Sequence, residues 1–163
     1  MGQKDKITLD DQLCFALFTA TNAIAQSYKP QLEEIGLTYP EYLVMLVIWQ
    51  EDETSVSRIA SRLSLSESTV AKLTRKLAAS DYLALSQDSS TDGANDRVSL
   101  TDDGRALEIG AARVWNNIVC QTQMGFEDLS RLRMELMSLT QRMKRDLEDM
   151  GGNKIDNLLD LAG

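Results

Sequence analysis

Histidine is absent from this 163-residue chain, and cysteine occurs only twice. Without histidine, the chain lacks the commonest general base and the commonest metal ligand of proteins. The two cysteines, Cys14 and Cys120, are far apart in the sequence and form no Cys-x-x-Cys motif, so neither a disulfide scaffold nor a zinc site is expected. The composition predicts a protein that is not an enzyme and that holds no metal and no cofactor.

Long apolar runs and a secretion signal are also lacking. No apolar stretch approaches the roughly 20 residues of a membrane span, and the first residues, MGQKDKITLDD, contain no signal-peptide core. We therefore expect a cytoplasmic protein without membrane contact. With 43% hydrophobic residues the chain can bury a core, and its length suits one domain with or without arms.

Positive charge is scarce, because 17 basic residues face 25 acidic ones and the net charge is −8. This balance argues against nucleic-acid binding by the whole surface. Residues 54–105 contain seven basic and seven acidic residues, which leaves 10 basic and 18 acidic residues in the rest of the chain. Within the neutral segment, Lys72, Arg75 and Lys76 fall within two turns of one predicted helix. A local basic patch of this kind predicts modest DNA affinity that falls steeply with salt.

Residues 55–79 have the pattern of two short helices joined by a tight turn. Apolar residues recur at helical spacing in both, and Ser66 is placed to cap the second helix. Small polar residues at the start of that helix, with cations further along, are typical of a helix-turn-helix, whose second helix enters the major groove. The apolar faces comprise Val56, Ile59, Ala60, Leu63, Val70, Leu73, Thr74 and Leu77. The candidate DNA-binding residues of the second helix are Ser66, Ser68, Thr69, Lys72, Arg75 and Lys76.

Two strand-like runs follow at 82–85 and 97–100, and the polar segment 87–96 between them contains Gly93. A hairpin directly after a helix-turn-helix is typical of a winged helix, and its tip commonly lies beside the minor groove or the phosphates. Arg97 is therefore a further candidate DNA-binding residue. The pattern alone also fits an ordinary helical hairpin with a surface β-ribbon.

Helical patterns flank this segment on both sides. Residues 9–36 predict a long helix that is capped by Asp10 or Asp11, is bent or restarted at Pro30, and ends at Gly36. A second helix begins at 39–41, with Pro40 in its first turn, and is apolar all round as far as residue 49, which predicts burial.

After the wing, one helix is expected from residue 102 and another from 129 to about 150, with a last short turn at 155–161. The apolar stripe of the first consists of Leu107, Ile109, Ala112, Trp115, Ile118 and Val119.

These patterns predict a mainly α fold with a small β-hairpin wing, in which N- and C-terminal helices form a dimerisation domain around a winged helix-turn-helix. The expected division is 1–53 for N-terminal dimerisation and sensor helices, 54–104 for DNA binding, and 105–163 for C-terminal dimerisation helices. The terminal helices have more apolar surface than the small winged domain can cover, so we expect them to interleave in a two-fold homodimer. The alternative is a terminal helix that folds back within one chain.

Cys14 lies in the first turn or so of the long helix. Unsatisfied amides there favour a thiolate, whereas burial among Leu13, Phe15 and Phe18 would favour the neutral thiol. A cysteine in an apolar helix is also commonly just a small core residue. Tyr28 is 14 residues further on, about 21 Å along the helix, so it can contact Cys14 only from a neighbouring antiparallel chain.

The segment from 10 to 50 closely resembles the start of the organic hydroperoxide-resistance regulators, a branch of the MarR family. The shared elements are QLCF, YKP and LTYPEYLVMLV ending in Trp49, and IASRLSLSESTVAKLTRKL and VSLTDDGR resemble the general MarR winged-helix pattern. The resemblance implies a dimeric repressor of a peroxide-detoxifying gene, with operator DNA as partner and an organic hydroperoxide as signal. It further implies that Cys14 is the redox sensor and that Tyr28 and Tyr39 are its hydrogen-bond partners from the other subunit.

In that family the thiolate becomes a sulfenic acid, which then pairs with a small thiol or with a second cysteine in the helix after the wing. Cys120 falls in that region and is the candidate resolving residue, although it also fits an ordinary buried helix position. The resemblance implies that oxidation separates the two DNA-reading heads and releases DNA.

Two positions depart from the family pattern. Residue 18 is Phe where some members have tyrosine, and the wing tip has Asp92-Gly93-Ala94 where members usually carry an arginine. We therefore predict weaker and less wing-dependent DNA binding, which an arginine introduced at Ala94 would strengthen.

Three other functions are compatible with the residues. The chain could be a MarR-type repressor released by a small apolar or phenolic ligand, with Cys14 inert; it could be a thiol peroxidase; or it could be an interaction protein that has lost DNA binding. Replacement of Cys14 by serine separates the first from redox sensing, because only a redox sensor loses its response to peroxide.

Overall fold

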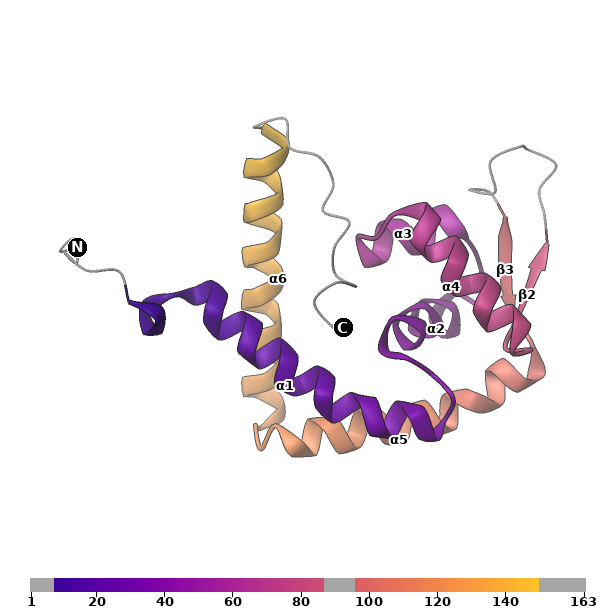
Figure 1. Cartoon of the computed structure of the whole chain (residues 1–163), viewed down its shortest axis with the longest axis horizontal. Helices are drawn as coiled ribbons and strands as arrows, with labels where there is room; N and C mark the ends of the chain where they lie inside the picture. The colour runs from indigo at the N-terminus through magenta and orange to yellow at the C-terminus, as the bar shows by residue number, and fades with distance from the viewer. Residues whose placement is uncertain (1–7, 87–95, 150–163) are drawn as a thin grey trace.

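The computed structural model describes residues 8–86 and 96–149, and its fold is mainly helical with one small sheet, as the sequence predicts (Figure 1). The N-terminal part contains a 3₁₀ turn (Leu9–Asp11), α1 (Leu13–Glu34), α2 (Tyr39–Glu51), β1 (Glu53–Ser55) and α3 (Val56–Leu63). It is followed by α4 (Glu67–Ala79), β2 (Leu83–Ser86), β3 (Arg97–Leu100), α5 (Asp102–Gln121) and α6 (Phe126–Asp149). The predicted last turn at 155–161 lies outside the described residues.

Helix α1 differs from its prediction at its start and at its proline. Asp10 and Asp11 do not cap it, because they belong to the preceding 3₁₀ turn, where Asp11 accepts a hydrogen bond from Thr8. The N-cap is Gln12, whose side chain makes no capping bond. Pro30 does not start a new segment, although it removes one backbone donor. The turns around it pack against α5, which holds the helix together.

Gly36 ends α1 as predicted, with a φ of 74° that favours glycine. Helix α2 then begins with a complete capping box, in which the Thr38 amide donates to Glu41 at 2.7 Å and the Thr38 side chain accepts from the amide of Glu41. As its apolar sequence predicts, α2 is buried. It lies in the middle of the molecule and packs against α1, α3, α4 and α5.

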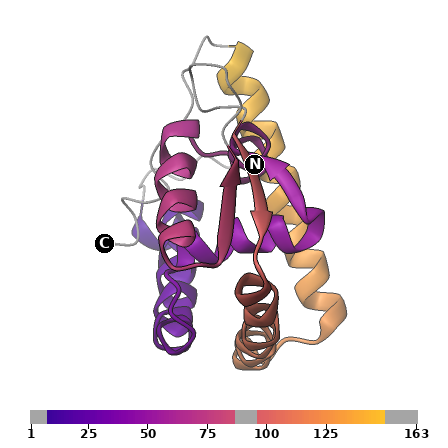
Figure 2. The same cartoon turned by 90° about the vertical axis from the view of Figure 1, so that its right-hand side faces the viewer.

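The sheet has three antiparallel strands in the order β1-β3-β2 (Figure 2). The hairpin of β2 and β3 was predicted, and its register pairs Leu83 with Leu100. Strand β1 was not predicted. It pairs with the other edge of β3, where Thr54 lies opposite Val98, so the base of the wing is anchored on both sides.

We call residues 37–101 the head and helices α1, α5 and α6 the arms. The head surrounds one continuous core, to which α5 and the end of α1 also contribute. The buried hydrophobic residues among the described part of the head are Leu37, Tyr42, Val44, Met45, Val47, Ile48, Val56, Ile59, Ala60, Leu65, Val70, Leu77, Leu83 and Val98.

The apolar stripe predicted for α5 is partly wrong. The face that packs against the rest of the chain contains Ala111, Val114 and Ile118, whereas Ile109 and Trp115 are 68% and 49% exposed. The prediction merged two faces of the helix, since one face packs within the chain and the other is left open.

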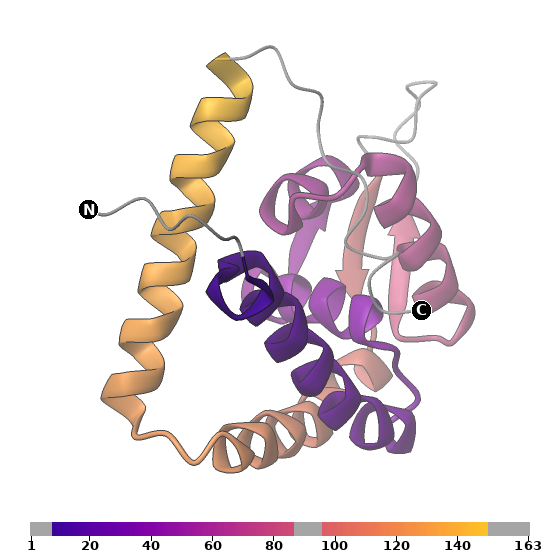
Figure 3. The same cartoon turned by 60° about the vertical axis from the view of Figure 1, so that its left-hand side comes forward.

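Helix α6 stands apart from the head and from α1 (Figure 3). Its tip approaches the head through one hydrogen bond, which Lys144 donates to Ser64 at 2.5 Å. Phe126 is 78% exposed, and Met134, Met137 and Met143 along the same helix are exposed as well. The arms therefore present the apolar surface that the sequence predicts.

Candidate functional site

The start of α4 carries a cluster of hydroxyl groups. Ser66 caps the helix as predicted, and its hydroxyl accepts from the amide of Thr69 at 3.3 Å. The same hydroxyl also bonds to the side chains of Thr69 and Ser68, at 2.8 and 3.1 Å. The preceding turn is closed by Ser64 in the left-handed conformation and by the buried Leu65. These contacts fix the orientation of the first turn of α4, where a recognition helix meets base edges.

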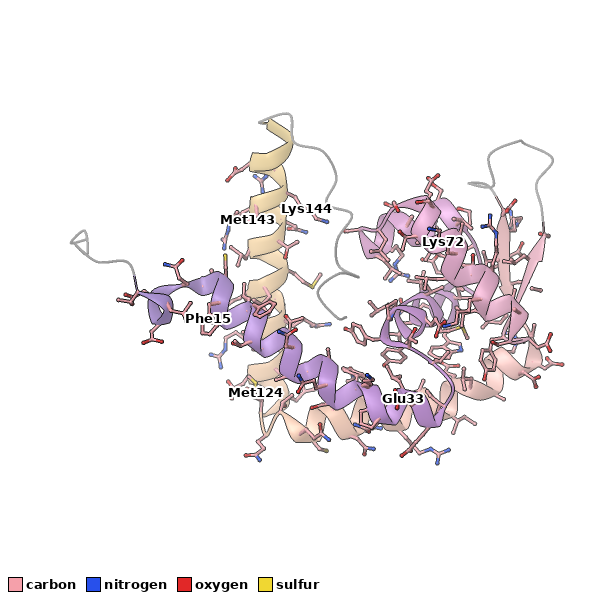
Figure 4. The ribbon with its side chains drawn as sticks, in the orientation of Figure 1. Phe15, Glu33, Lys72, Met124, Met143 and Lys144 are labelled. Carbon is pink, nitrogen blue, oxygen red and sulfur yellow. The ribbon has the colours of Figure 1, made fainter. Side chains whose placement is uncertain are left out.

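The predicted cations divide into two groups. Lys72 and Arg75 are exposed on α4, and neither takes part in an ion pair among the described residues (Figure 4). Lys76 instead pairs with Glu41 at 2.7 Å, and Arg97 pairs with Glu53 across the sheet. Two of the four predicted cations are therefore held within the protein. The wing tip, including Ala94, lies outside the described residues.

Glu41 connects α4 to the start of α2. Burial raises the pKa of its carboxyl, but hydrogen bonds from Lys76 and Thr38 lower it by more, so the pKa lies below the usual value. The carboxylate is thus charged at neutral pH, although it is almost completely buried.

Glu51 makes a similar tie between α2 and α3. It accepts hydrogen bonds from Arg58 at 2.6 Å and from Arg62 at 2.8 Å, and Arg62 also donates to Gln50. The hydrogen bond from Arg58 is the main cause that lowers the pKa of Glu51 to about 2. The first helix of the helix-turn-helix is therefore fixed to the central helix.

Three tyrosines form a second cluster, at the junction of α1 and α2. The ring centroids of Tyr28 and Tyr39 are 5.1 Å apart, and Tyr42 lies 5.7 Å from Tyr28 and 6.4 Å from Tyr39. Tyr28 and Tyr39 were predicted as site residues, and the structure brings them together. Tyr42 was missed, although its position three residues after Tyr39 on a helix is a signal that it shares the same face.

The three phenols remain protonated at neutral pH. Burial raises the pKa of each, and the neighbouring phenols raise that of Tyr28 further. The cluster is thus a set of neutral hydroxyl groups that can donate hydrogen bonds.

Cys14 lies in the first turn of α1 and is exposed. The burial that would favour a neutral thiol is absent within one chain, because Leu13, Phe15 and Phe18 beside it are also exposed. Figure 4 shows Phe15 on this end of α1, well away from Lys72 on the head. The structure does not bring Cys14 to the tyrosine cluster of its own chain, from which it is separated by about 21 Å of helix.

Cys120 is near the end of α5 and is also exposed within the single chain. Helices α1 and α5 run antiparallel, since Asn117 donates to Gln31 at 3.0 Å and Gly110 lies against Ile35. Cys120 is therefore level with the Tyr28 region of α1, and Cys14 is too far along the same helix for a disulfide within one chain.

Other site types find no support in the part of the chain that the structure describes. It contains no cluster of three potential metal ligands, and no helix that is long and apolar enough to cross a membrane.

Comparison with known proteins identifies the head. The model of the MarR family matches residues 37–90, which cover α2 to β2. The regulator TtmR of Methylorubrum extorquens (strain PA1) is 41% identical over 107 residues. That match covers 66% of this chain, and the chain spans 54% of the length of TtmR. The organic hydroperoxide resistance transcriptional regulator of Bacillus subtilis (strain 168) is 27% identical over 139 residues, covering 85% of this chain and 94% of the relative.

The fold is shared with AbfR of Staphylococcus epidermidis. Its crystal structure matches with a TM-score of 0.68 and 25% identity, over 84% of this chain and 92% of AbfR. Reduced AbfR bound to DNA gives a TM-score of 0.68 at 24% identity, covering 83% and 94% of the two chains. Disulfide-formed AbfR gives 0.61 at 24% identity, covering 86% and 92%.

The family resemblance that the sequence motifs indicate is thereby confirmed. The matched residues contain α2, the helix-turn-helix and the strands β1 and β2, and the relatives are named as transcriptional regulators. Residues 37–90 form a MarR family domain, which contains the helix-turn-helix of the head.

Proposed function

We propose that the protein is a homodimeric transcriptional repressor that binds operator DNA when reduced and releases it when an organic hydroperoxide oxidises Cys14. The observation that carries the proposal is the pairing of an exposed cysteine at one end of α1 with a cluster of neutral phenols at the other. An antiparallel copy of α1 places Cys14 of the partner subunit beside Tyr28 and Tyr39.

The DNA-binding surface is the exposed side of α4. Ser66, Ser68 and Thr69 begin the helix, and Lys72 and Arg75 follow with their cations directed to phosphates. Reduced AbfR, which shares the fold, has been solved bound to DNA. Because Lys76 and Arg97 already have acidic partners, we assign most of the electrostatic contribution to Lys72 and Arg75.

The homodimer follows from the uncovered faces of the arms. A lone helix such as α6, with an exposed row of methionines, is marginal in water unless its apolar side is packed. A two-fold arrangement covers the open faces of α1, α5 and α6 together, and it also gives the two heads the spacing for successive major grooves.

The redox step is a two-electron oxidation of sulfur. The Cys14 thiolate attacks the terminal oxygen of the hydroperoxide, an S–O bond forms and the O–O bond breaks. The alkoxide leaves and takes up a proton as the alcohol, and cysteine becomes a sulfenic acid. Neutral phenols beside the sulfur stabilise the thiolate by donating hydrogen bonds, and they orient the peroxide.

Cys120 is well placed to resolve this product. Because it is level with Tyr28, the arrangement that brings Cys14 of the partner subunit to the phenols also brings it towards Cys120. The Cys120 thiolate would attack the sulfenic sulfur and expel hydroxide, which leaves an intersubunit disulfide and water. This step would strain the arms and move the heads apart.

The test is a binding titration against the promoter region adjoining the protein's own gene. It is made on reduced protein and after about one equivalent of cumene hydroperoxide, with Cys14→Ser in parallel. Cys120→Ser is the matched control, because its Cys14 should still be oxidised, but it should form no disulfide and should keep more of its DNA than the parent. Release from the parent and not from Cys14→Ser supports the proposal.

Each contrary result selects another function. A DNA affinity that is the same before and after peroxide points to a repressor controlled by a small ligand. No specific binding, even at low salt, points to a partner other than DNA. Repeated consumption of peroxide with added thiol points to a peroxidase.

A further inference from the structure

Residues 51–53 carry three consecutive carboxylates, and each of them pairs with arginine of a different element. We call these residues the acidic segment, which joins the end of α2 to β1. The pairs are Glu51 with Arg58 and Arg62 of α3, Asp52 with Arg105 of α5, and Glu53 with Arg97 of β3. Every described cation of the head outside α4 therefore has its partner in the acidic segment.

The three carboxylates differ in how firmly they hold arginine. Glu51 is only 17% exposed and accepts from Arg58 and Arg62 together, at 2.6 and 2.8 Å. Asp52 and Glu53 each hold a single arginine, and in both pairs each side chain is more than half exposed. A single exposed ion pair contributes little free energy, because water solvates both charges well. The pairs of Asp52 and Glu53 can therefore exchange partners at low cost.

Glu53 and Arg97 lie on the outer face of the sheet. Neighbouring residues of a strand point to opposite faces, and Thr54 and Val98, which are next to them in β1 and β3, are both buried. Ser55 is directly opposite Arg97 in the register, so Glu53 reaches Arg97 diagonally across the two strands. Both ends of this ion pair therefore face away from the core.

Arg97 lies at the end of the sheet that is next to the start of α3. It is the first residue of β3, and the amide of Val56, the first residue of α3, donates to the carbonyl of Asp96 at 3.2 Å. Strand β3 runs from there to α5, so Arg105 lies beyond its other end (Figure 1). In a winged helix-turn-helix, the first helix crosses the DNA backbone and the wing lies beside the phosphates. Of the two exchangeable arginines, Arg97 is thus the one that phosphates should approach.

We propose that Glu53 attenuates DNA binding, because it pairs with Arg97 and so keeps that cation from the phosphates. A cation that already has an acidic partner adds no net charge to the surface and displaces few counterions from DNA. When a phosphate takes Arg97, Glu53 is left as an unpaired negative charge nearby, which offsets part of the free energy gained. This inference rests on the proposed function and deepens it, since it concerns the affinity of the same DNA-binding head.

The variant that tests the inference is Glu53→Gln in the full-length dimer, because glutamine keeps the shape of the side chain and removes its charge. The measurement is the dissociation constant for the promoter region adjoining the protein's own gene, taken at several salt concentrations. Each dimer gains two unpaired cations, so we expect about fivefold tighter binding at roughly 0.1 M salt. The plot of log affinity against log salt concentration should steepen by about 1.8, since each neutralised phosphate contributes about 0.9.

Asp52→Asn is the matched control for charge. It removes the neighbouring carboxylate and frees Arg105, and asparagine tolerates the positive φ of 58° at this position. Because Arg105 lies beyond the other end of β3, we expect the affinity to change by less than about twofold. An equal gain in the two variants would show that only the total charge of the acidic segment matters, and would overturn the inference.

A double-mutant cycle with Arg97→Gln shows whether Glu53 acts through Arg97. If it does, Glu53→Gln should bring less than about half of its gain in binding free energy once Arg97 is replaced. An undiminished gain there would mean that Glu53 repels DNA through its charge alone. Weaker binding by Glu53→Gln itself would mean that the ion pair holds the wing in place for DNA. Either result, or an unchanged affinity and salt slope, would overturn the inference.

An unrelated duplex of the same length separates this inference from the proposed function. Phosphate contacts carry no sequence information, so Glu53→Gln should tighten binding to that duplex as much as to the promoter. If the parent binds neither duplex at low salt, the proposed function is wrong and the inference falls with it. If peroxide releases the promoter from the parent, but Glu53→Gln leaves both affinities unchanged, only the assignment of Glu53 is wrong.

Discussion

The head and the arms contain similar proportions of apolar residues, but the head buries far more of them and the arms leave many exposed. Ile48, Val70 and Val98 of the head are completely buried, whereas Ile109 and Phe126 of the arms are mostly exposed. In the part of the chain that is described, Leu85 is the one large exposed hydrophobic residue of the head. The head therefore completes its core within one chain, whereas the arms leave apolar faces open, which a second chain covers in the proposed dimer. Contact between the two regions should then carry the signal from sensor to DNA.

The largest loss of stability is expected for Gly104→Ala, at the start of α5, where the helix touches the head. A Cβ at this position would lie 2.1 Å from the backbone carbonyl oxygen of Tyr82, and backbone cannot give way as a flexible side chain can. We expect a loss of about 3 kcal/mol or more in the free energy of unfolding, measured by urea titration.

Gly110→Ala on the same helix is the control for this prediction. Its Cβ would meet the side chain of Ile35 at 3.1 Å, which can shift, and alanine favours the helix. Equal unfolding midpoints for the two variants would contradict the account of the head.

In the arms, Met137→Glu should act on assembly and leave the fold of the head intact. Met137 is exposed on α6, and in a two-fold dimer each substitution buries a charge in both copies. We expect the dissociation constant of the dimer to rise about 100-fold or more, as measured by analytical ultracentrifugation. Leu85→Glu, on an exposed apolar residue of the head, should leave it unchanged. A dimer that tolerates both substitutions would show that α6 does not lie in the interface.

A smaller effect is expected within the head, at the ion pair that links α4 to the start of α2. Glu41→Gln retains the capping box, because glutamine can also accept from Thr38, but it removes the ion pair with Lys76. The cost should be about 1 kcal/mol, since the lysine end of the pair is open to solvent. In a Lys76→Met background the same substitution should cost clearly less, and an undiminished cost there would mean that the pair is not the cause.

The smallest effect concerns acid stability and Glu51. The pKa of Glu51 is about 2 in the folded protein, against 4.5 as its ordinary value. Its contribution is therefore complete above pH 4.5 and is lost as the pH falls towards 2. Glu51→Gln should flatten the fall of the urea midpoint over this range, because the variant lacks the stabilisation at neutral pH and differs little from the parent near pH 2. An unchanged acid slope would mean that the contacts with Arg58 and Arg62 do not persist in solution.

Local signals predicted most of the head. A capping residue such as Ser66 acts within one helical turn, and the helical spacing of apolar residues marks the buried faces of α3 and α4. Strand β1 was not predicted because its three residues are polar and form a strand only by pairing with β3, which is distant in sequence. The helix-turn-helix and the hairpin were therefore predictable, and the third strand was not.

The candidate site was predictable only in part. Cys14, Tyr28 and Tyr39 follow from motifs; the helical spacing from Tyr39 also indicates the face of Tyr42, but its contact with Tyr28 depends on the packing of α1 against α2, which no local pattern describes. The stripe of α5 was misjudged for a related reason, because residues that face a second chain have the same apolar pattern as residues that face the core. The division of the chain at 53 and 104 stays a prediction.

The central claim is that Cys14 and Tyr28 act together across two subunits. It is tested most directly by the rate of Cys14 oxidation in two heterodimers. In the first, one subunit carries Cys14→Ser and the other Tyr28→Phe. In the second, one subunit carries both substitutions and the other none. The account predicts one intact sensor site, and parental reactivity at that site, in the first heterodimer only. Parental reactivity in the second heterodimer alone would show that the two residues act within one chain, and would contradict the account.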